Sequence, residues 1–89
     1  SIRREKKMKR YSILERSGYT TYSKTDLFHT LKYLKLTKQD IIVYDDTDDK
    51  HKVILTYIEN RVSFTKDVVA EMPGVLKLYA GCELGAPLE

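Results

Sequence analysis

Four aspartates occupy five consecutive positions within the stretch IIVYDDTDDKHKVIL, residues 41–55. Carboxylates crowded in this way can bind a cation or a basic protein surface, or they can form a solvated turn. Two like charges about 6 Å apart repel each other by roughly 1 kcal/mol before salt screening. A turn needs only one or two such residues. We therefore expect an acidic interaction face made of Asp45, Asp46, Asp48 and Asp49, with a merely solvated turn as the alternative.

The spacing of these aspartates does not match a calcium loop. The EF-hand loop requires a glycine at its sixth position and a bidentate glutamate at its twelfth. Counted from Asp46, those positions hold His51 and Tyr57, and counting from Asp45 gives no better match. We expect neither a bound metal nor a cofactor.

Catalytic residue types are sparse and scattered. His29 and His51 fall on different expected elements, and the single cysteine, Cys82, lies near the C-terminus. The chain has no glycine-rich phosphate loop, no Cys/His set with metal spacing and no nucleophile elbow. The expectation is surface histidines, an incidental thiol and a protein that is not an enzyme.

Basic residues gather at the start of the chain, where the first ten residues, SIRREKKMKR, hold six lysines and arginines and one acid. We expect residues 1–7 to be a flexible basic leader, and Lys9, Arg10 and Arg16 to form a basic interaction face. The alternative partner is a polyanion, because clustered cations neutralise phosphates without reading sequence.

Composition indicates one small domain. The chain has 89 residues, a net charge of +3 and 33% charged residues, and it contains no apolar run long enough to cross a membrane. A lone cysteine favours a reducing compartment, so we expect a cytoplasmic or nuclear protein. The domain is expected to span residues 8–82. Residues 83–89 would then be a tail that ends in Leu-Glu, a pair typical of expression vectors.

The pattern along the chain predicts an α+β domain. Strands are expected at residues 8–16, 19–23, 40–45, 52–58 and 75–80. Ser23 and Asp26 are typical of a helix start, and Leu27, Leu31 and Leu34 follow at helical spacing up to residues 36–38. A second, short helix is expected within residues 63–72, capped by Ser63 or Thr65 and stopped by Pro73-Gly74.

This ββαββαβ order resembles that of the β-grasp, or ubiquitin-like, superfold, in which a mixed sheet packs on one helix. A right-handed crossover would place the last strand beside the first, in parallel. The expected core consists of Ile13, Leu27, Leu31, Leu34, Ile42, Val53, Leu55, Val69, Leu76 and Leu78.

Within that superfold, the run VYDDTDDKHKVIL resembles the acidic hairpin of the Phox/Bem-type interaction domains. FTKDVVAEM and VLKLYA stand where that family has a short helix and a closing strand. The family usually has a glycine in the turn, where this chain has Thr47 and Lys50. The resemblance implies that the acidic turn of one molecule binds a lysine or arginine on the first strand of another. Such contacts form open chains if the rotation between copies does not close.

Two sister families on the same scaffold leave further alternatives. LKLYAGCELGAPL is similar to the end of doublecortin-type domains, which bind microtubules through basic surfaces, and cell-death-activator domains also pair an acidic face with a basic one. The leading hypothesis is a non-catalytic protein–protein interaction module with opposed acidic and basic faces that can associate with itself head to tail. The alternatives are a binder of microtubules or nucleic acid through residues 3–16, and a structural domain of a larger assembly without a binding face of its own.

Overall fold

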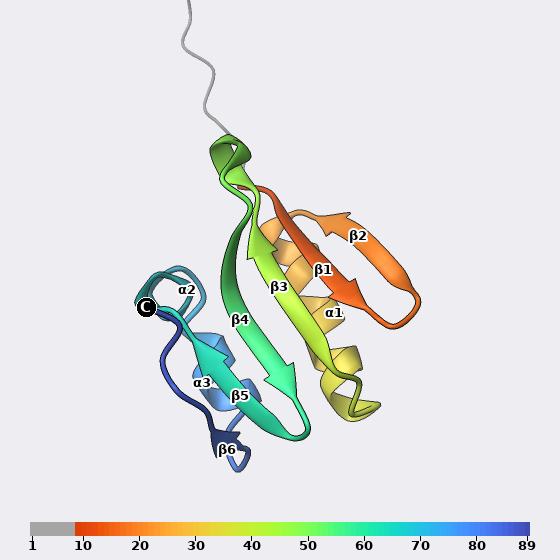
Figure 1. The fold of residues 1–89 in the computed structure, drawn as a ribbon, viewed down its shortest axis with the longest axis vertical. Coiled ribbons are helices and arrows are strands. Elements are labelled where there is room, and N and C mark those ends of the chain that lie inside the picture. The colour runs from red at the N-terminus through yellow and green to blue at the C-terminus, as the bar shows by residue number, and fades with distance from the viewer. Residues whose placement is uncertain (1–8) are drawn as a thin grey trace, which may run out of the picture.

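The computed structural model describes residues 9–89 and shows a sheet with short helices on one side (Figure 1). The chain begins with strands β1 (Tyr11–Glu15) and β2 (Gly18–Tyr22) and continues into helix α1 (Lys24–Leu36). The second half contains β3 (Ile41–Asp45), the 3₁₀ turn η1 (Thr47–Asp49), β4 (Lys52–Ile58), β5 (Arg61–Phe64), α2 (Lys66–Glu71), α3 (Gly74–Leu78) and β6 (Glu83–Leu84). The predicted α+β class and mixed sheet are confirmed.

The six strands lie in the order β2-β1-β3-β4-β5-β6. Every neighbouring pair is antiparallel except β5 and β6, which are parallel. The β-grasp order is not confirmed, because β1 has β2 and β3 as its neighbours and the last strand pairs with β5. The register of β1 against β3 places Tyr11 opposite Asp45, so the start of β1 lies beside the end of β3.

Helix α1 forms as its sequence predicts. The Ser23 hydroxyl accepts a hydrogen bond from the Asp26 amide, and Leu27, Leu31 and Leu34 are buried along one face. In Figure 1 the helix lies behind β1 and β3, so it covers one face of the sheet. The other face of β1 and β3 therefore has no helix upon it.

The segment after β4 differs most from expectation. Residues 75–78 lie in helix α3 and residues 79–80 in the turn that follows it, so the strand predicted for residues 75–80 is wrong. Val75 and Tyr79, four residues apart, are both buried, whereas Leu76 between them is 52% exposed. This is the periodicity of a helix, and a short apolar run does not distinguish a helix from a strand. The helix expected within residues 63–72 is present as α2, and Thr65 caps it by accepting from the Val68 amide.

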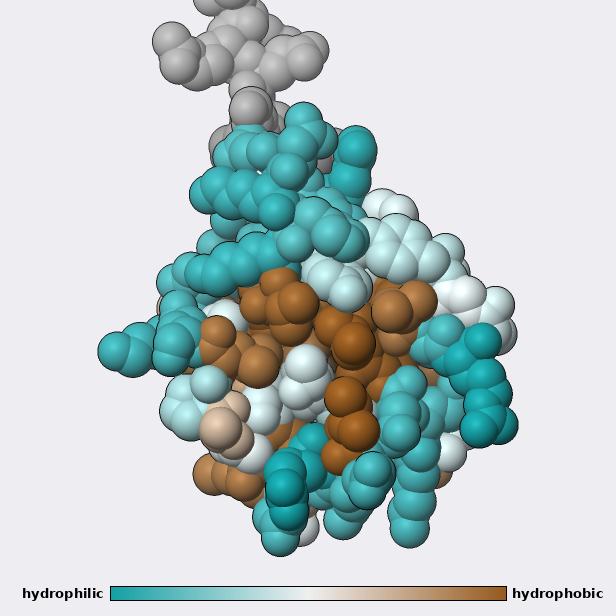
Figure 2. All heavy atoms as spheres, viewed as in Figure 1, coloured by the Kyte–Doolittle hydropathy of each residue, from teal (hydrophilic) through white to brown (hydrophobic). Residues whose placement is uncertain are grey.

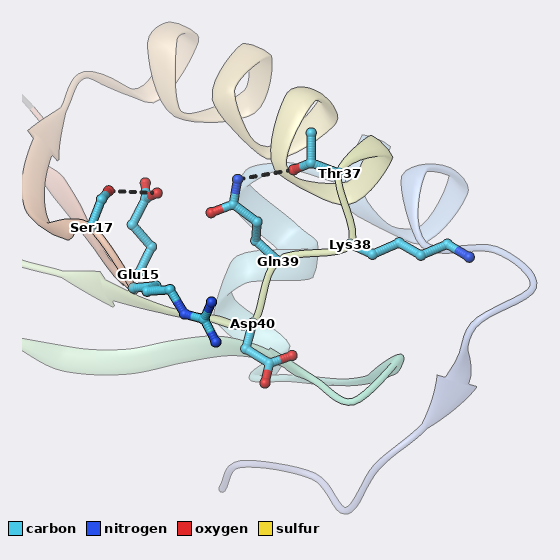
Figure 3. Close-up of a pocket in the computed structure, with 7 residues that line it drawn as sticks. Glu15, Ser17, Thr37, Lys38, Gln39 and Asp40 are labelled. Atoms are coloured by element: carbon cyan, nitrogen blue, oxygen red, sulfur yellow. Dashed lines mark hydrogen bonds between the residues drawn. The ribbon is translucent and has the colours of Figure 1, made fainter.

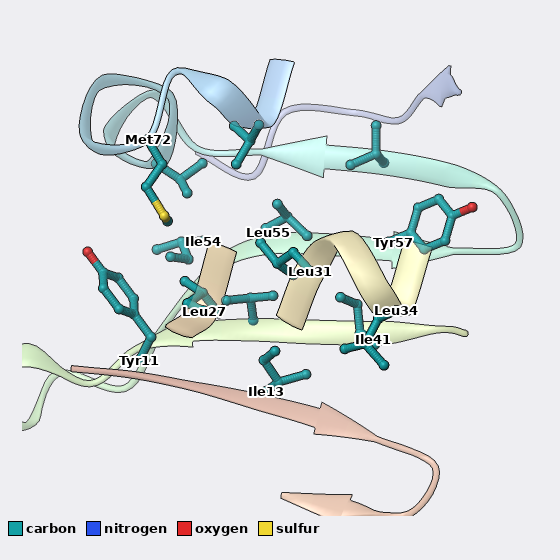
Figure 4. Close-up of a cluster of buried hydrophobic side chains, with 14 of the residues drawn as sticks. Tyr11, Ile13, Leu27, Leu31, Leu34, Ile41, Ile54, Leu55, Tyr57 and Met72 are labelled. Carbon is teal, nitrogen blue, oxygen red and sulfur yellow. The ribbon is translucent and has the colours of Figure 1, made fainter. Parts of the chain in front are cut away.

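The core lies between the sheet and the helices, where side chains from β1, β3, β4 and α1 meet (Figure 4). Of the predicted core, Ile13, Leu27, Leu31, Leu34 and Leu55 are buried, and Val69 and Leu78 pack against the core while partly exposed. The exposed Leu76 is a wrong prediction, and Ile42 and Val53 are only partly buried. The prediction missed the buried residues Tyr11, Ile41, Val43, Ile54, Tyr57, Val62, Val68, Met72, Val75 and Tyr79.

Residues 83–89, expected as a tail, lie along β5. Glu83 and Leu84 pair with Arg61 and Val62, and the Gly85 amide donates to the Val62 carbonyl at 2.7 Å. The expected leader, residues 1–7, falls outside the described residues. None of the helices within residues 9–89 has the length and apolar character that a membrane crossing requires.

Candidate functional site

The aspartates lie in a loop that joins β3 to β4, which we call the acidic loop (residues 45–51). Asp45 ends β3, and the loop continues through η1. Asp48, Asp49 and His51 have φ angles of 59°, 59° and 48°. Non-glycine residues tolerate this left-handed region poorly, and Asp and His are among those that tolerate it best. The loop, residues 45–51, therefore turns without a glycine.

Hydrogen bonds attach the acidic loop to the start of β1. The Asp46 amide donates to the Arg10 carbonyl at 2.8 Å, and the Arg10 amide donates to the Thr47 hydroxyl at 3.0 Å. Within the loop, the Asp45 carboxylate accepts from the Thr47 amide at 2.9 Å. These contacts hold the loop backbone in one conformation.

A second set of contacts anchors the loop to the uncovered face of the sheet. The Asp46 carboxylate accepts from Nδ1 of His51 at 2.6 Å, and the Tyr19 hydroxyl lies 3.0 Å from the same nitrogen. Tyr19 and Ser12 share a hydrogen bond of 2.8 Å, and the Tyr44 ring stacks on His51 with centroids 4.0 Å apart. We call these five residues the anchor cluster; they join β1, β2 and β3 to the loop.

The anchor cluster lowers the pKa of Asp46. Partial burial by itself would raise the pKa of the Asp46 carboxyl, but hydrogen bonds from Ser12 and His51 and the nearby charges of His51 and Arg10 outweigh it. The pKa of Asp46 is therefore held below its ordinary value. Asp48 and Asp49 are exposed residues of the loop that Asp46 attaches to the sheet.

The predicted basic residues do not lie together. Lys9 and Arg10 precede β1 and lie beside the acidic loop, and Lys9 forms an ion pair with Glu71 at 3.0 Å. The charge of Glu71 and its hydrogen bond raise the pKa of Lys9. Arg16 lies at the other end of β1. Of the three predicted basic residues, it is the one remote from the aspartates of the acidic loop.

Arg16 lines a polar hollow of about 700 Å³ between the β1–β2 turn and the end of α1 (Figure 3). Glu15, Lys38 and Asp40 lie around the same hollow, so opposite charges are mixed there. The Glu15 carboxylate accepts from the Ser17 hydroxyl at 3.0 Å. The hollow has no excess of one charge that would select an ionic ligand.

The uncovered face of the sheet carries an apolar patch, which the sequence pattern did not predict. Figure 2 shows hydrophobic residues gathered in the middle of this face, with hydrophilic residues around them. Leu14 and Ile58 are each 40% exposed, and together with Ile42 they line a shallow, mostly apolar depression of about 210 Å³. We call these three residues the apolar patch.

Four residues of the anchor cluster were also missed, and only Asp46 was among the predicted site residues. His51 was expected to be an ordinary surface histidine, and its position five residues after Asp46 was the one local signal for a contact between them. Tyr19 lies 32 positions from His51, so only the fold brings them together. Within residues 9–89, no group of three or more His, Cys, Asp or Glu side chains is placed to hold a metal ion.

No protein-family model, curated protein or solved structure matches the chain.

Proposed function

We propose that this chain is a non-catalytic protein–protein interaction domain that presents its acidic loop to a basic protein surface. The observation that carries the proposal is the attachment of the loop: Asp46 is held by His51, which is held by Tyr19 and Tyr44 on the sheet. A charged loop that is already in one conformation loses less entropy on binding than a flexible one. Its charges mainly set orientation and association rate.

The apolar patch adds a second contact to the same proposal. It lies on the face that also holds the anchor cluster, so one partner can cover both. Protein interfaces combine an apolar centre with a polar, charged rim, and the patch and loop supply these two parts. Leu14 and Ile58 already have 40% of their surface in water, which a partner would remove.

Ser12, His51 and Asp46 are residue types found in catalytic triads, but their arrangement supports a structural role. The Ser12 side chain is fully buried and cannot reach a substrate. Its hydroxyl bonds to Tyr19, whose hydroxyl in turn lies between Ser12 and His51. A nucleophile needs both access and a hydrogen bond to its base.

The partner in this proposal is a basic protein, which includes a second copy of the chain. In a head-to-tail contact, Arg16 is the basic group at the end opposite the acidic loop. Lys9 and Arg10 are beside the loop, where the aspartates weaken the field that a phosphate would need, so the structure favours a basic partner over a polyanion. The proposal requires no relationship to ubiquitin-like or Phox/Bem-type domains. It includes an intracellular location, cytoplasmic or nuclear, because a lone cysteine forms no internal disulfide.

The test removes the charges of Asp48 and Asp49 and leaves the anchor cluster in place. The variant Asp48→Asn/Asp49→Asn keeps Asp45 and Asp46, and asparagine tolerates the left-handed φ of these two positions as aspartate does, so the loop should retain its conformation. Binding of the synthetic peptide RREKKMKR, used as a probe for a basic protein surface, is measured by calorimetry at about 50 mM salt. We expect at least a tenfold loss in the variant, and a marked loss for the wild type at about 500 mM salt.

The matched control is Glu59→Lys, which changes one exposed carboxylate in the β4–β5 turn, at the other end of the sheet. It should bind the peptide nearly as well as the wild type. Equal loss in the control and the loop variant would show a nonspecific effect of net charge and would contradict the proposal. Tight binding of RNA or tubulin instead of the peptide would favour the polyanion hypothesis, and binding of neither would favour a structural domain.

A further inference from the structure

The outer edge of β2 is open. β2 (Gly18–Tyr22) is the first strand of the sheet and pairs only with β1 among the described residues. Four of its five residues are exposed, and Tyr22 is partly buried. An edge strand of this kind presents a row of backbone amide and carbonyl groups to which a further strand can add.

β2 lacks the features that usually protect an edge strand. Natural edges carry lysines or prolines, contain bulges, or lie under another segment. The sequence of β2, GYTTY, contains no charged residue and no proline, and its five residues pair with β1 in an unbroken register. Tyr and Thr are residues that favour strands. The opposite edge is different, because Glu83 and Leu84 pair with β5 and the Gly85 and Leu88 amides donate to its carbonyls.

We propose that β2 pairs with β2 of a second copy, antiparallel and centred on Thr20, to form a symmetric dimer. In an antiparallel ladder, the residues of one strand direct their backbone groups alternately toward one neighbour and the other. The β1–β2 turn has two residues, so Gly18, Thr20 and Tyr22 bond to β1, and Tyr19 and Thr21 direct their backbone groups outward. In the proposed register Tyr19 lies opposite Thr21 of the partner, so these outward groups bond to each other.

The side chains of β2 complement themselves in this register. Thr20 lies opposite the partner's Thr20, and Tyr22 lies opposite the partner's Gly18. Paired threonines, and a β-branched residue opposite an aromatic one, stabilise antiparallel pairs, and no two like charges meet. An aromatic side chain beside a glycine also covers the bare backbone of the glycine. This self-complementarity identifies a second copy as the occupant.

The proposed contact between the two β2 strands has two-fold symmetry. A two-fold contact uses the same edge of both copies, so assembly stops at the dimer instead of continuing as a filament. A strand of five residues buries less surface than the roughly 1,200 Å² of a standard interface, so the dimer should be weak, with a micromolar or higher dissociation constant. The contact does not include Asp48 or Asp49, and it is independent of the proposed function.

Charge pairing at the centre of the contact provides the test. Thr20→Lys and Thr20→Glu are made separately, because Thr20 is exposed and each copy should still fold, as circular dichroism checks. Sedimentation equilibrium of the wild type should show a dimer that increases with concentration. Each variant alone should dimerise at least tenfold more weakly, because two like charges face each other, and an equal mixture of the two should regain the association.

Thr21→Lys is the matched control. Residue 21 lies opposite residue 19 in the proposed register, so the two new lysines do not face each other and the loss should be smaller than for Thr20→Lys. Amide exchange gives a direct check, because the Tyr19 and Thr21 amides should gain protection as concentration rises while the Thr20 amide stays protected throughout.

A wild type that remains monomeric up to about 1 mM would overturn the proposal, since that is the weak end of specific association. Failure of the Lys and Glu variants to associate with each other would also overturn it. Asp48→Asn/Asp49→Asn should dimerise like the wild type, so failure of the dimer and failure of the proposed function are distinguishable.

Discussion

The two faces of the sheet differ in what their side chains do. On the covered face, Ile13, Val43 and Leu55 from three adjacent strands are fully buried under the helices. On the uncovered face, the neighbouring residues Leu14 and Ile42 alternate with the polar anchor cluster and stay partly in water. Burial of apolar side chains, and with it most of the hydrophobic stabilisation, is therefore concentrated on the covered face. The other face leaves apolar side chains such as Leu14 and Ile58 partly in water.

The largest expected effect is on the covered face. Leu31→Ala removes a fully buried side chain from α1 and leaves a cavity, so we expect a loss of about 2–5 kcal/mol in the free energy of unfolding. Leu14→Ala on the uncovered face removes the same atoms from a side chain that is 40% exposed, and it should cost less than half as much. Urea unfolding measures both. Equal losses would mean that the two faces do not differ as described.

The anchor cluster should contribute a smaller and pH-dependent amount. Asp46→Asn removes the charge that His51 and Ser12 stabilise, and at pH 7 it should cost about 1–2 kcal/mol. Because the folded state lowers the pKa of Asp46, the wild type gains this stability above the pKa of the unfolded carboxyl, about 3.9. The stability is lost as the pH falls through the lower folded pKa.

Urea unfolding at pH 7 and at about pH 2.5 tests this dependence. The difference between the wild type and Asp46→Asn should shrink at the lower pH. A difference that stays constant between the two pH values would show that Asp46 acts through packing and not through its charge.

The apolar patch should matter more for binding than for folding. Ile58→Thr replaces a side chain that is already 40% exposed with another β-branched residue, so it should change the free energy of unfolding by less than about 1 kcal/mol. If a partner covers this face, the same variant should weaken its binding severalfold. A variant that is strongly destabilised would show that the uncovered face also supports the fold.

The smallest effect is expected at the ion pair of Lys9 with Glu71. Both side chains are more than a third exposed, so solvent screens the pair even though the pKa of Glu71 is lowered and that of Lys9 is raised. Glu71→Gln should change the free energy of unfolding by less than about 0.5 kcal/mol, and about 1 M salt should remove the difference. A larger, salt-insensitive effect in thermal unfolding would mean that the pair is a structural contact.

Local sequence signals predicted helix α1 and the strand pair β3 and β4. Ser23, Asp26 and the buried leucines of α1 all act within a few residues of one another, and β4 spans residues 52–58 as expected. The same kind of signal failed at residues 75–80, because the apolar pattern of VLKLYA suits either a strand or a helix. Packing of Val75 and Tyr79 into the core selected the helix. β5 was missed because the strand has only four residues and is followed directly by Thr65, the cap of helix α2.

The candidate site likewise has features that the sequence predicted and features that only the fold shows. The charge and the turn character of residues 45–49 were readable from the sequence, because four aspartates within five residues cannot be buried together. The anchors of that turn were not, because Ser12 and Tyr19 lie more than 30 positions before His51 and meet it only through the pairing of β1 with β2 and β3. That pairing also placed Lys9 and Arg10 beside the aspartates they were expected to oppose.

The sequence by itself therefore determined the α+β class, the amphipathic helix and the position of an acidic loop, because each follows from hydrophobic period, helix capping or charge over a few residues. Only the tertiary structure decided the strand order, the uncovered face, the anchor cluster and the open edge of β2. Those features arise from the register of strands far apart in the chain, and register depends on the packing of the whole core.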